Sequence, residues 1–484
     1  MNSTRLHSPS SLLALLAAAC LSACSMIPSY QRPAAPVAEQ WPAAATGAAS
    51  APVSASPSAS TPTAPASDVA WQDFFADPSL RQLIDTALAN NRDLRVAVLN
   101  IEQARAQLGI KRADQWPTLN AVATGSRTPT SSGGINSLYS AGVAVTAYEL
   151  DFFGRVASLK EQALAQFLAS TEGSRTARIS LIASVAQSWL ALLADEELLS
   201  ISQQTLATRE GSLKLVQLRF DYGATSELEL RQAQSLLESA RVTLAQQQRQ
   251  RALDENALVL LLGQALPAEV RARLPSARLT LLRLPELPAG LPSDLLTRRP
   301  DIRQAEQQLL AANANIGAAR AAFFPRISLT AGLGSASSAL SGLFKDGAWG
   351  FTVAPQALLP LFDAGRNRAA LASARVGFDI AVAQYEKSIQ SAFREVADAL
   401  AGRDTLAQQL QAQQAQLDAE TDRLRLTDLR YQNGAASQLD WLDAQRSQFA
   451  SQQALVQVRL AYLQNQVALY KTLGGGAGAD TGAP

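Results

Sequence analysis

The chain is poor in the side chains on which most enzymatic and metal chemistry depends. It has one histidine, His7, two cysteines, Cys20 and Cys24, and two methionines, Met1 and Met26. This scarcity excludes histidine-dependent triads, metal sites built from histidine and cysteine, disulfides and a methionine-lined copper path. Catalysis by carboxylates alone is the enzymatic alternative that remains. We therefore predict a non-enzyme with no catalytic residues, no metal site and no cofactor.

The chain also lacks an excess of charge of either sign. Lys and Arg number 42 and Asp and Glu 41 among 484 residues, for a net charge of +1. Because binding to nucleic acid depends on a basic surface that neutralises phosphates, we expect no nucleic-acid partner. The abundance of Ala, Leu, Gln and Arg favours long helices instead.

The N-terminus has the features of an export signal. Arg5 precedes an apolar stretch, residues 12–21, that is too short to span a bilayer. The segment Leu21-Ser22-Ala23-Cys24 resembles a bacterial lipobox, so we predict a signal peptide at 1–23 and fatty acyl chains such as palmitate on Cys24. Several acyl chains give stable membrane anchoring. The alternative is an ordinary leader with an incidental cysteine.

Two segments are predicted to lie outside any folded core. Residues 24–69 form the lipidated N-terminus followed, at 34–68, by an Ala-, Ser-, Pro- and Thr-rich stretch with almost no charge, which we expect to be a flexible tether. Residues 475–484 are expected to be a disordered tail.

The body between these segments is predicted to be two copies of one unit. Gly223 and Gly434 occupy matching turns, 211 positions apart, and other motifs recur in the same order in each half. Such a repeat predicts two structurally equivalent parts. We place the first copy at 70–263, an equatorial linker at 264–293 and the second copy at 294–474. The other matched motifs are Leu150–Arg155 with Leu361–Arg366, Arg92–Arg95 with Pro300–Arg303, and Arg112–Pro117 with Arg320–Pro325.

Each copy alternates long helical segments with short strands. Two of the predicted helices, 226–262 and 294–322, are shorter than the others in the body. We expect them to stack end to end, so that together they match the length of one long helix. Period-two alternation predicts strands at about 118–127, 140–150, 326–335 and 349–358. Helical and heptad-like spacing predicts helices at about 77–113, 156–220, 226–262, 294–322 and 367–431.

The number of strands predicts an oligomer. Strands of about ten residues suit a tilted crossing of a bilayer, but strands in lipid need a closed barrel, and bacterial barrels start at eight strands. Four strands cannot close, so several chains must contribute. We predict an α+β membrane protein with a transmembrane β-barrel shared between chains and long α-helices packed as in a coiled coil.

The turns after the two longest helices are similar in both copies. Gly223 and Gly434 fit left-handed helix caps. Ser226 and Ser437 then open the returning helices, each as the first residue of a capping box.

Three acidic residues lie at the start of the returning helices. Glu229 and Asp440 are the capping-box acids, and this role is a sufficient structural explanation for them. Asp443 lies about one turn further along, where the other copy has Gln232. A charge present in only one copy is not required by the fold. Asp440 and Asp443 would form stacked acidic rings if symmetry brings these helices around an axis.

Several of these motifs together resemble the TolC-type outer-membrane efflux ducts (outer membrane factors), most closely the lipoprotein branch that includes OprM. The resemblance covers roughly residues 70–474 and the lipobox. It implies a homotrimer in the outer membrane of a Gram-negative bacterium, in contact with its lipid, with a long α-helical coiled-coil tunnel that extends into the periplasm. It also implies two partners, a periplasmic adaptor (membrane fusion protein) and an inner-membrane pump of the RND type. The motifs are Tyr148–Arg155, Leu296–Ile302, Leu361–Arg366 and the two Gly-x-x-Ser turns.

The same resemblance implies a gate. Asp440 and Asp443 match acidic rings at the periplasmic constriction, and Tyr431 matches a tyrosine that ties the closed tip. Glu229 stands where the polar partner of that tyrosine lies in the family.

One position departs from the family's gate. The position at which the family's closing network has an arginine is Ala436 in this chain, so we expect Arg430 or Arg219 to take over its role. The turns themselves would face the adaptor. These tip residues are Tyr222, Gly223, Ala224, Thr225, Asn433, Gly434, Ala435 and Ala436.

We therefore expect a passive exit duct for drugs or other small molecules, as in multidrug resistance. The sequence shows no phosphate-binding Gly-rich loop, so the duct would have no energy source of its own. The same duct serving type I polypeptide secretion is an alternative, because the partner pump selects the cargo. A non-porous, lipid-anchored coiled-coil protein is an alternative of another class.

Overall fold

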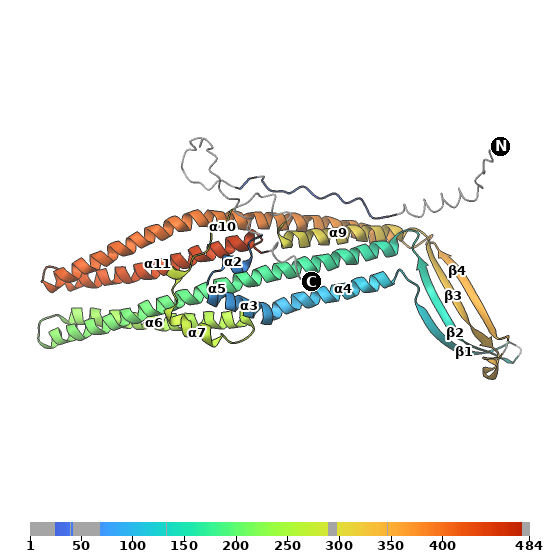
Figure 1. The fold of residues 1–484 in the computed structure, drawn as a ribbon, viewed down its shortest axis with the longest axis horizontal. Helices are drawn as coiled ribbons and strands as arrows, with labels where there is room; N and C mark the ends of the chain where they lie inside the picture. Colours follow the sequence, from blue (N-terminus) through green and yellow to red (C-terminus); the bar gives the residue numbers. More distant parts are fainter. Residues whose placement is uncertain are drawn as a thin grey trace, which may run out of the picture. The chain divides into compact units, whose positions relative to one another are not determined.

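Two compact units make up the described part of the chain (Figure 1). Each unit contains segments of both predicted copies, so this division by contacts cuts across the repeat. The computed structural model describes residues 25–38, 40–41, 68–131, 133–288, 298–345 and 347–476. The first unit takes its described residues from Met1–Ala35, Leu99–Thr171 and Gln304–Lys387, and the second from Pro36–Val98, Glu172–Arg303 and Ser388–Pro484.

The first unit contains one antiparallel sheet. Its strands are β1 (Leu119–Pro129), β2 (Ile135–Leu150), β3 (Arg326–Ser337) and β4 (Trp349–Leu358), hydrogen-bonded in that order. All four predicted strands are confirmed. Within the described residues, β1 and β4 are edge strands that pair on one side only. Such edges need partners from elsewhere if the sheet lies in lipid.

The last strand has an apolar face that the chain leaves uncovered. Trp349, Phe351 and Val353 are exposed, Phe351 to 81%, and they alternate with Gly350 and Thr352. This period-two pattern is that of a strand with one face toward lipid.

Two helical hairpins form much of the second unit. Helix α5 (Arg155–Asp221) turns into α6 (Glu227–Leu262), and α10 (Arg366–Gln432) turns into α11 (Gln438–Thr472). Figure 1 shows α6 beside α5 and α11 beside α10. The bounds predicted for α5, α6 and α10 agree with these helices, and α11 starts directly after Ser437, as predicted. Helix α5 includes an apolar stretch long enough to cross a membrane, but 56% of that stretch is buried inside the chain, as in a core helix.

The helix predicted at 77–113 is in fact two helices, α3 (Pro78–Asn90) and α4 (Arg92–Ala113). Asn91 separates them with extended backbone angles. Its side-chain Oδ1 accepts a hydrogen bond from Leu94 N at 2.9 Å, and its Nδ2 donates to the carbonyl of Leu261 at 2.9 Å. The asparagine thus caps the second helix and ties its start to the end of α6.

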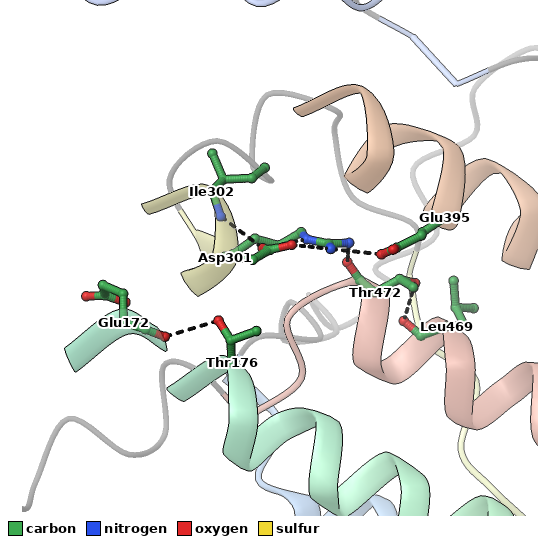
Figure 2. A network of polar contacts seen from close by, with 8 residues as sticks. Glu172, Thr176, Asp301, Ile302, Glu395, Leu469 and Thr472 are labelled. Carbon is green, nitrogen blue, oxygen red and sulfur yellow. Dashed lines mark hydrogen bonds and ion pairs between the residues drawn. The ribbon is translucent and has the colours of Figure 1, made fainter. Parts of the chain in front are cut away.

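The second copy repeats this junction with a different side chain. Helix α9 (Pro300–Ala321) follows Arg299, whose Nη1 donates to the carbonyl of Thr472 at 2.8 Å, at the end of α11. The same guanidinium also binds Asp301 and, at 2.8 Å, Glu395, and Figure 2 shows these carboxylates with Thr472.

These two junctions correct one prediction. Leu261 and Thr472 are 211 positions apart, so each returning helix ends against the first helix of its own copy. The predicted stacking of 226–262 on 294–322 is therefore wrong: α6 meets α4, and α11 meets α9.

The linker at 264–293 contains short helical turns as far as it is described. They are α7 (Ala268–Arg273) and the 3-10 turns Leu274–Ser276 and Leu279–Leu281. Val270, Leu274 and Leu279 on these turns are buried. The turn Leu279–Leu281 contacts α11, so these buried side chains do not form a separate core.

The described segment that precedes the predicted tether is held by the first unit. Arg32 makes two hydrogen bonds of 2.7 Å to Glu306 on α9, and Tyr30 donates to the same carboxylate at 3.3 Å. Asn313 Nδ2 donates to the carbonyl of Pro28 at 2.9 Å. Ion pairing and hydrogen bonds therefore fix the residues just before the tether predicted at 34–68. Inside the tether, Trp41 stacks on Phe393 with ring centroids 4.9 Å apart, so the prediction of flexibility is wrong at Trp41. Cys24, the signal peptide at 1–23 and residues 42–67 lie outside the described residues.

The C-terminal prediction needs a smaller correction. Gly475 is buried against the ring of Tyr470, which leaves no room for a Cβ at this position. Tyr470 itself stacks on Phe74 of α2 (Trp71–Phe74) with ring centroids 4.3 Å apart. The predicted disordered tail therefore does not begin at 475. Residues 477–484 lie outside the described residues.

Candidate functional site

The two helical tips have the same backbone structure. Gly223 and Gly434 have φ angles of 68° and 72°. Ala224 N donates to the carbonyl of Arg219, and Ala435 N to that of Arg430, both at 2.7 Å. These are the bonds of a left-handed C-terminal cap, so the predicted glycine caps are confirmed in both copies.

The caps of the two returning helices differ. Asp440 N donates to Ser437 Oγ at 3.1 Å, and Asp440 Oδ2 accepts from Ser437 N at 3.1 Å, so the predicted capping box is complete. In the other copy Ser226 Oγ accepts from Glu229 N at 3.3 Å, which is one half of such a box. Hydrogen bonds from Ser437 hold the pKa of the exposed Asp440 carboxyl below its usual value. Asp440 is therefore both charged and engaged in the cap.

Tyr431 joins the two hairpins. The Nη1 of Arg219 on α5 donates to the Tyr431 hydroxyl on α10 at 2.6 Å, and its guanidinium carbon lies 5.9 Å from the ring centroid. Trp441 on α11 stacks on the same ring at 5.2 Å, with an interplanar angle of 7°. We call Arg219, Tyr431 and Trp441 the tip latch. Charge-assisted hydrogen bonds and aromatic stacking both favour this geometry.

The other residues predicted for this network lie elsewhere. Arg430 Nη2 donates to the carbonyl of Ala435 at 3.2 Å, inside its own turn. Among the described contacts, Glu229 has no bond to Tyr431; its backbone nitrogen serves the Ser226 cap. Of the two arginines expected to replace the one missing at Ala436, Arg219 is the one that lies on Tyr431.

Asp443 lies beside two cations. Arg423 Nη2 on α10 approaches one of its oxygens at 2.8 Å, and Arg446 Nη2 approaches the other at 3.1 Å. Arg423 also pairs with Glu420 at 3.2 Å. The Asp443 carboxylate is exposed, but these two arginines of its own chain already compensate its negative charge. A ring of such groups would therefore produce a weaker electrostatic field.

Sequence reasoning overlooked Trp441. The corresponding residue of the first copy, 211 positions earlier, is Leu230, which packs with Phe220 and Val216. The comparison of copies that selected Asp443 would have selected Trp441 as well, since the aromatic ring is present in one copy only.

Several exposed apolar side chains surround the tips in both copies. Leu228 and Leu439 are equivalent and are 67% and 56% exposed, and Tyr222 is 82% exposed. Large apolar side chains exposed at equivalent places are typical of a surface that binds a partner. Leu215 and Leu218 of α5, and their equivalents Leu426 and Leu429 of α10, are exposed as well.

Comparison with known proteins agrees with this architecture. The profile of the outer membrane efflux protein family matches residues 83–264 and 291–475, one segment for each copy. The chain belongs to the outer membrane efflux protein family.

Named relatives support the assignment over the full length of the chain. It is 48% identical over 480 residues to the antibiotic efflux pump outer membrane protein ArpC of Pseudomonas putida, covering 98% of this chain and 97% of that protein. It is 45% identical to the outer membrane protein OprJ of Pseudomonas aeruginosa, covering 96% and 95%. The outer membrane efflux protein described here is therefore an outer-membrane component of an efflux pump.

A solved structure gives the same fold. The open state of the MtrE outer membrane channel of Neisseria gonorrhoeae is 40% identical and covers 95% of this chain and 100% of its own, with a TM-score of 0.83. The antiparallel sheet and paired long helices thus belong to an outer-membrane channel fold.

Proposed function

We propose that this protein is the passive exit duct of a tripartite efflux pump and exports drugs or other small molecules. The uncovered apolar face of β4 and the two unpaired sheet edges support closure of one barrel by several chains. Three chains, the number in the family that the sequence resembles, would contribute twelve strands. The duct itself has no enzymatic role.

Relatives indicate the kind of cargo. ArpC is named for antibiotic efflux, and a relative from Pseudomonas putida that is also 48% identical is named for toluene efflux. Apolar and amphipathic small molecules are therefore the cargo we propose. A periplasmic adaptor would dock on the exposed leucines at the tips, and an inner-membrane pump of the RND type would supply the energy.

Lipidation of Cys24 is part of the proposal. Arg320 Nη1, at the end of α9, donates to the carbonyl of Met26 at 3.4 Å, and β3 starts at Arg326. Met26, two positions after the predicted lipidation site, therefore lies near the start of a membrane strand. This place suits acyl chains that enter the adjoining leaflet.

The tip latch is the proposed closing element of the gate. It joins the two hairpins of one chain through a side chain on each, and its bond is directional, so separation of the hairpins must break it. Asp440 and Asp443 are proposed to line the constriction as acidic rings. Docking of the adaptor would then separate the hairpins.

Complementation separates the proposed cargo from the alternatives. The chain would be expressed with the adaptor and RND pump of a toluene-exporting system in a strain that lacks its own outer-membrane channels. Restored resistance to toluene and antibiotics supports the small-molecule duct. Restored export of a polypeptide alone, together with a type I pump, would favour secretion. Failure of both, with no conductance in planar bilayers, would favour a non-porous structural protein.

A further inference from the structure

The second unit contains an apolar pocket that the proposed function leaves unexplained. Its volume is about 350 Å³, near the lower end for sites that hold small organic molecules. The pocket lies where the connection between α2 and α3, the long helix α5, the linker and α11 meet. Its inner wall is apolar and consists of side chains that are each at most 2% exposed, namely Phe75, Leu80, Leu190 and Val467.

The outer wall of the pocket is a short run of leucines on the linker. Leu281 is 74% exposed, and Leu282 and Leu284 are half-buried. An apolar chain lying in the pocket would remove part of this surface from water, which favours binding in proportion to the area covered. The linker therefore presents apolar surface that an occupant can use.

Two charged side chains line the pocket, Asp77 and Arg283. Asp77 Oδ1 accepts a hydrogen bond from Ser79 N at 3.1 Å, and Oδ2 accepts from Leu80 N at 3.2 Å and from Trp189 Nε1 at 3.0 Å. Three donors thus engage this carboxylate in the cap of α3 and in the packing of α5. Arg283 is exposed, and among the contacts of the described residues its guanidinium has no hydrogen bond or ion pair. The charge that remains available at the edge of the pocket is therefore positive.

The repeat does not require this pocket. Two of its wall residues have smaller or polar counterparts 211 positions away, since Leu190 corresponds to Ala401 and Val467 to Asn256. The same helical plan is built in both copies, so large apolar side chains at these two places are not needed for the plan. The wall of the pocket is a feature of one copy only.

We propose that this pocket binds an amphipathic anion, a single-chain alkyl carboxylate of medium length. The alkyl chain would lie against Leu190 and Leu281, and the carboxylate would pair with Arg283, whose planar guanidinium matches a carboxylate with two parallel hydrogen bonds. A volume of about 350 Å³ is too small for a lipid with two chains. Binding would join the linker to α5 and α11 and so stabilise the second unit. The inference is independent of the proposed cargo, because every residue it uses belongs to one unit of one chain.

Photo-labelling of the full-length protein in lipid nanodiscs tests the site. The probe is a decanoate analogue that carries a diazirine in its alkyl chain. Irradiation and peptide mass spectrometry are expected to place the label in the peptides that contain residues 75–80 and 281–284. Excess decanoate should protect these peptides. Decanol and decyltrimethylammonium should protect them about tenfold less well, because neither can accept a charge-assisted hydrogen bond from Arg283.

Variants of exposed residues separate the contributions of the headgroup and the chain. Arg283→Glu reverses the charge at the pocket and should reduce the labelling of both peptides by about tenfold. The matched control is Arg273→Glu, because Arg273 is exposed on α7 of the same linker but does not line the pocket. It should be labelled like the wild type. Leu281→Asp places a charge in the outer wall and should reduce labelling as well, and its exposed position keeps the change compatible with folding.

Three results would overturn the proposal. Equal protection by decanol and decanoate, or equal labelling of Arg283→Glu and Arg273→Glu, would show that the pocket does not recognise an anion. Label found only in the strands β1 to β4, in protein whose helices are intact by circular dichroism, would show partition into lipid and no binding at the pocket. Labelling of 75–80 and 281–284 that decanoate does not reduce would show unspecific reaction. Failure of the protein to conduct or to export would refute the proposed function and leave these labelling results unaffected.

Discussion

The two copies in this chain share a backbone plan but not their polar side chains. At the junction between helices, Asn91 and Arg299 bind equivalent carbonyls, those of Leu261 and Thr472. One junction uses a neutral amide, and the other a buried guanidinium with two carboxylates. The helical fold therefore requires a hydrogen-bond donor at this junction, but not a charged one. Differences between the two copies then mark the residues that do more than build the fold.

The largest expected effect is at the charged junction. Arg299→Ala removes a buried cation and leaves the Thr472 carbonyl without its donor, so we expect a loss of about 3 kcal/mol. This is the low end for buried pairs, because the partner carboxylates are about a third exposed. Asn91→Ala, the matched variant, should lose about 1 kcal/mol. Thermal unfolding of the two variants measures the difference, and equal losses would contradict it.

A buried acidic pair in the first copy should make stability depend on pH. Asp195 on α5 is buried beside Asp254 on α6, where the second copy has the neutral Leu406 and Asn465. Burial, with the hydrogen bond and charge of Asp254, raises the pKa of Asp195 to about 8; Glu196 adds to this and Arg251 opposes it. Since the folded chain holds a proton that the unfolded chain releases near pH 4, stability should fall as pH rises from about 4 to 8.

The variant Asp195→Asn isolates this effect. It should flatten the pH profile of the melting temperature between pH 5 and 8 and should stabilise the chain at pH 8, by about 3 kcal/mol if half of the shift survives relaxation. Asp254→Asn is the matched control and should act in the same direction. A wild-type profile without a slope in this window would show that the pair does not share a proton.

A smaller effect is expected at the acidic ring. Asp443→Asn should reduce the preference of the channel for cations, but only modestly, because Arg423 and Arg446 already compensate the carboxylate. Gln232→Glu places an acid at the equivalent site of the other copy and should change selectivity in the opposite direction. Reversal potentials in a salt gradient measure both effects. Identical values for the wild type and both variants would show that Asp443 does not line the constriction.

The sequence predicted the elements of regular structure well, because strong signals determine them locally. Period-two alternation located all four strands, and Gly223 and Gly434 located the ends of the longest helices. The break at Asn91 escaped prediction since apolar spacing continues across it. What decides the break is a carbonyl 170 residues away.

Contacts between distant side chains were harder to predict. Arg219 and Tyr431 were both predicted to belong to the gate, but Glu229 was expected as the partner of Tyr431. Sequence spacing gives the face of a helix on which a residue lies and not the direction of its side chain. Arg32 and Glu306, 274 residues apart, hold the segment that precedes the predicted tether. No local pattern carries such information.

Single-channel recording of Arg219→Ala against the wild type tests the central claim most directly, namely that this chain is a duct closed at its tips by the bond to Tyr431. We expect the wild type in planar bilayers to be closed most of the time and Arg219→Ala to be open about tenfold more often, as the loss of one charge-assisted hydrogen bond predicts. Arg430→Ala, the equivalent variant of the other copy, should have a smaller effect. Equal open probabilities in the wild type and Arg219→Ala would contradict the latch, and the absence of conductance from both would contradict the duct.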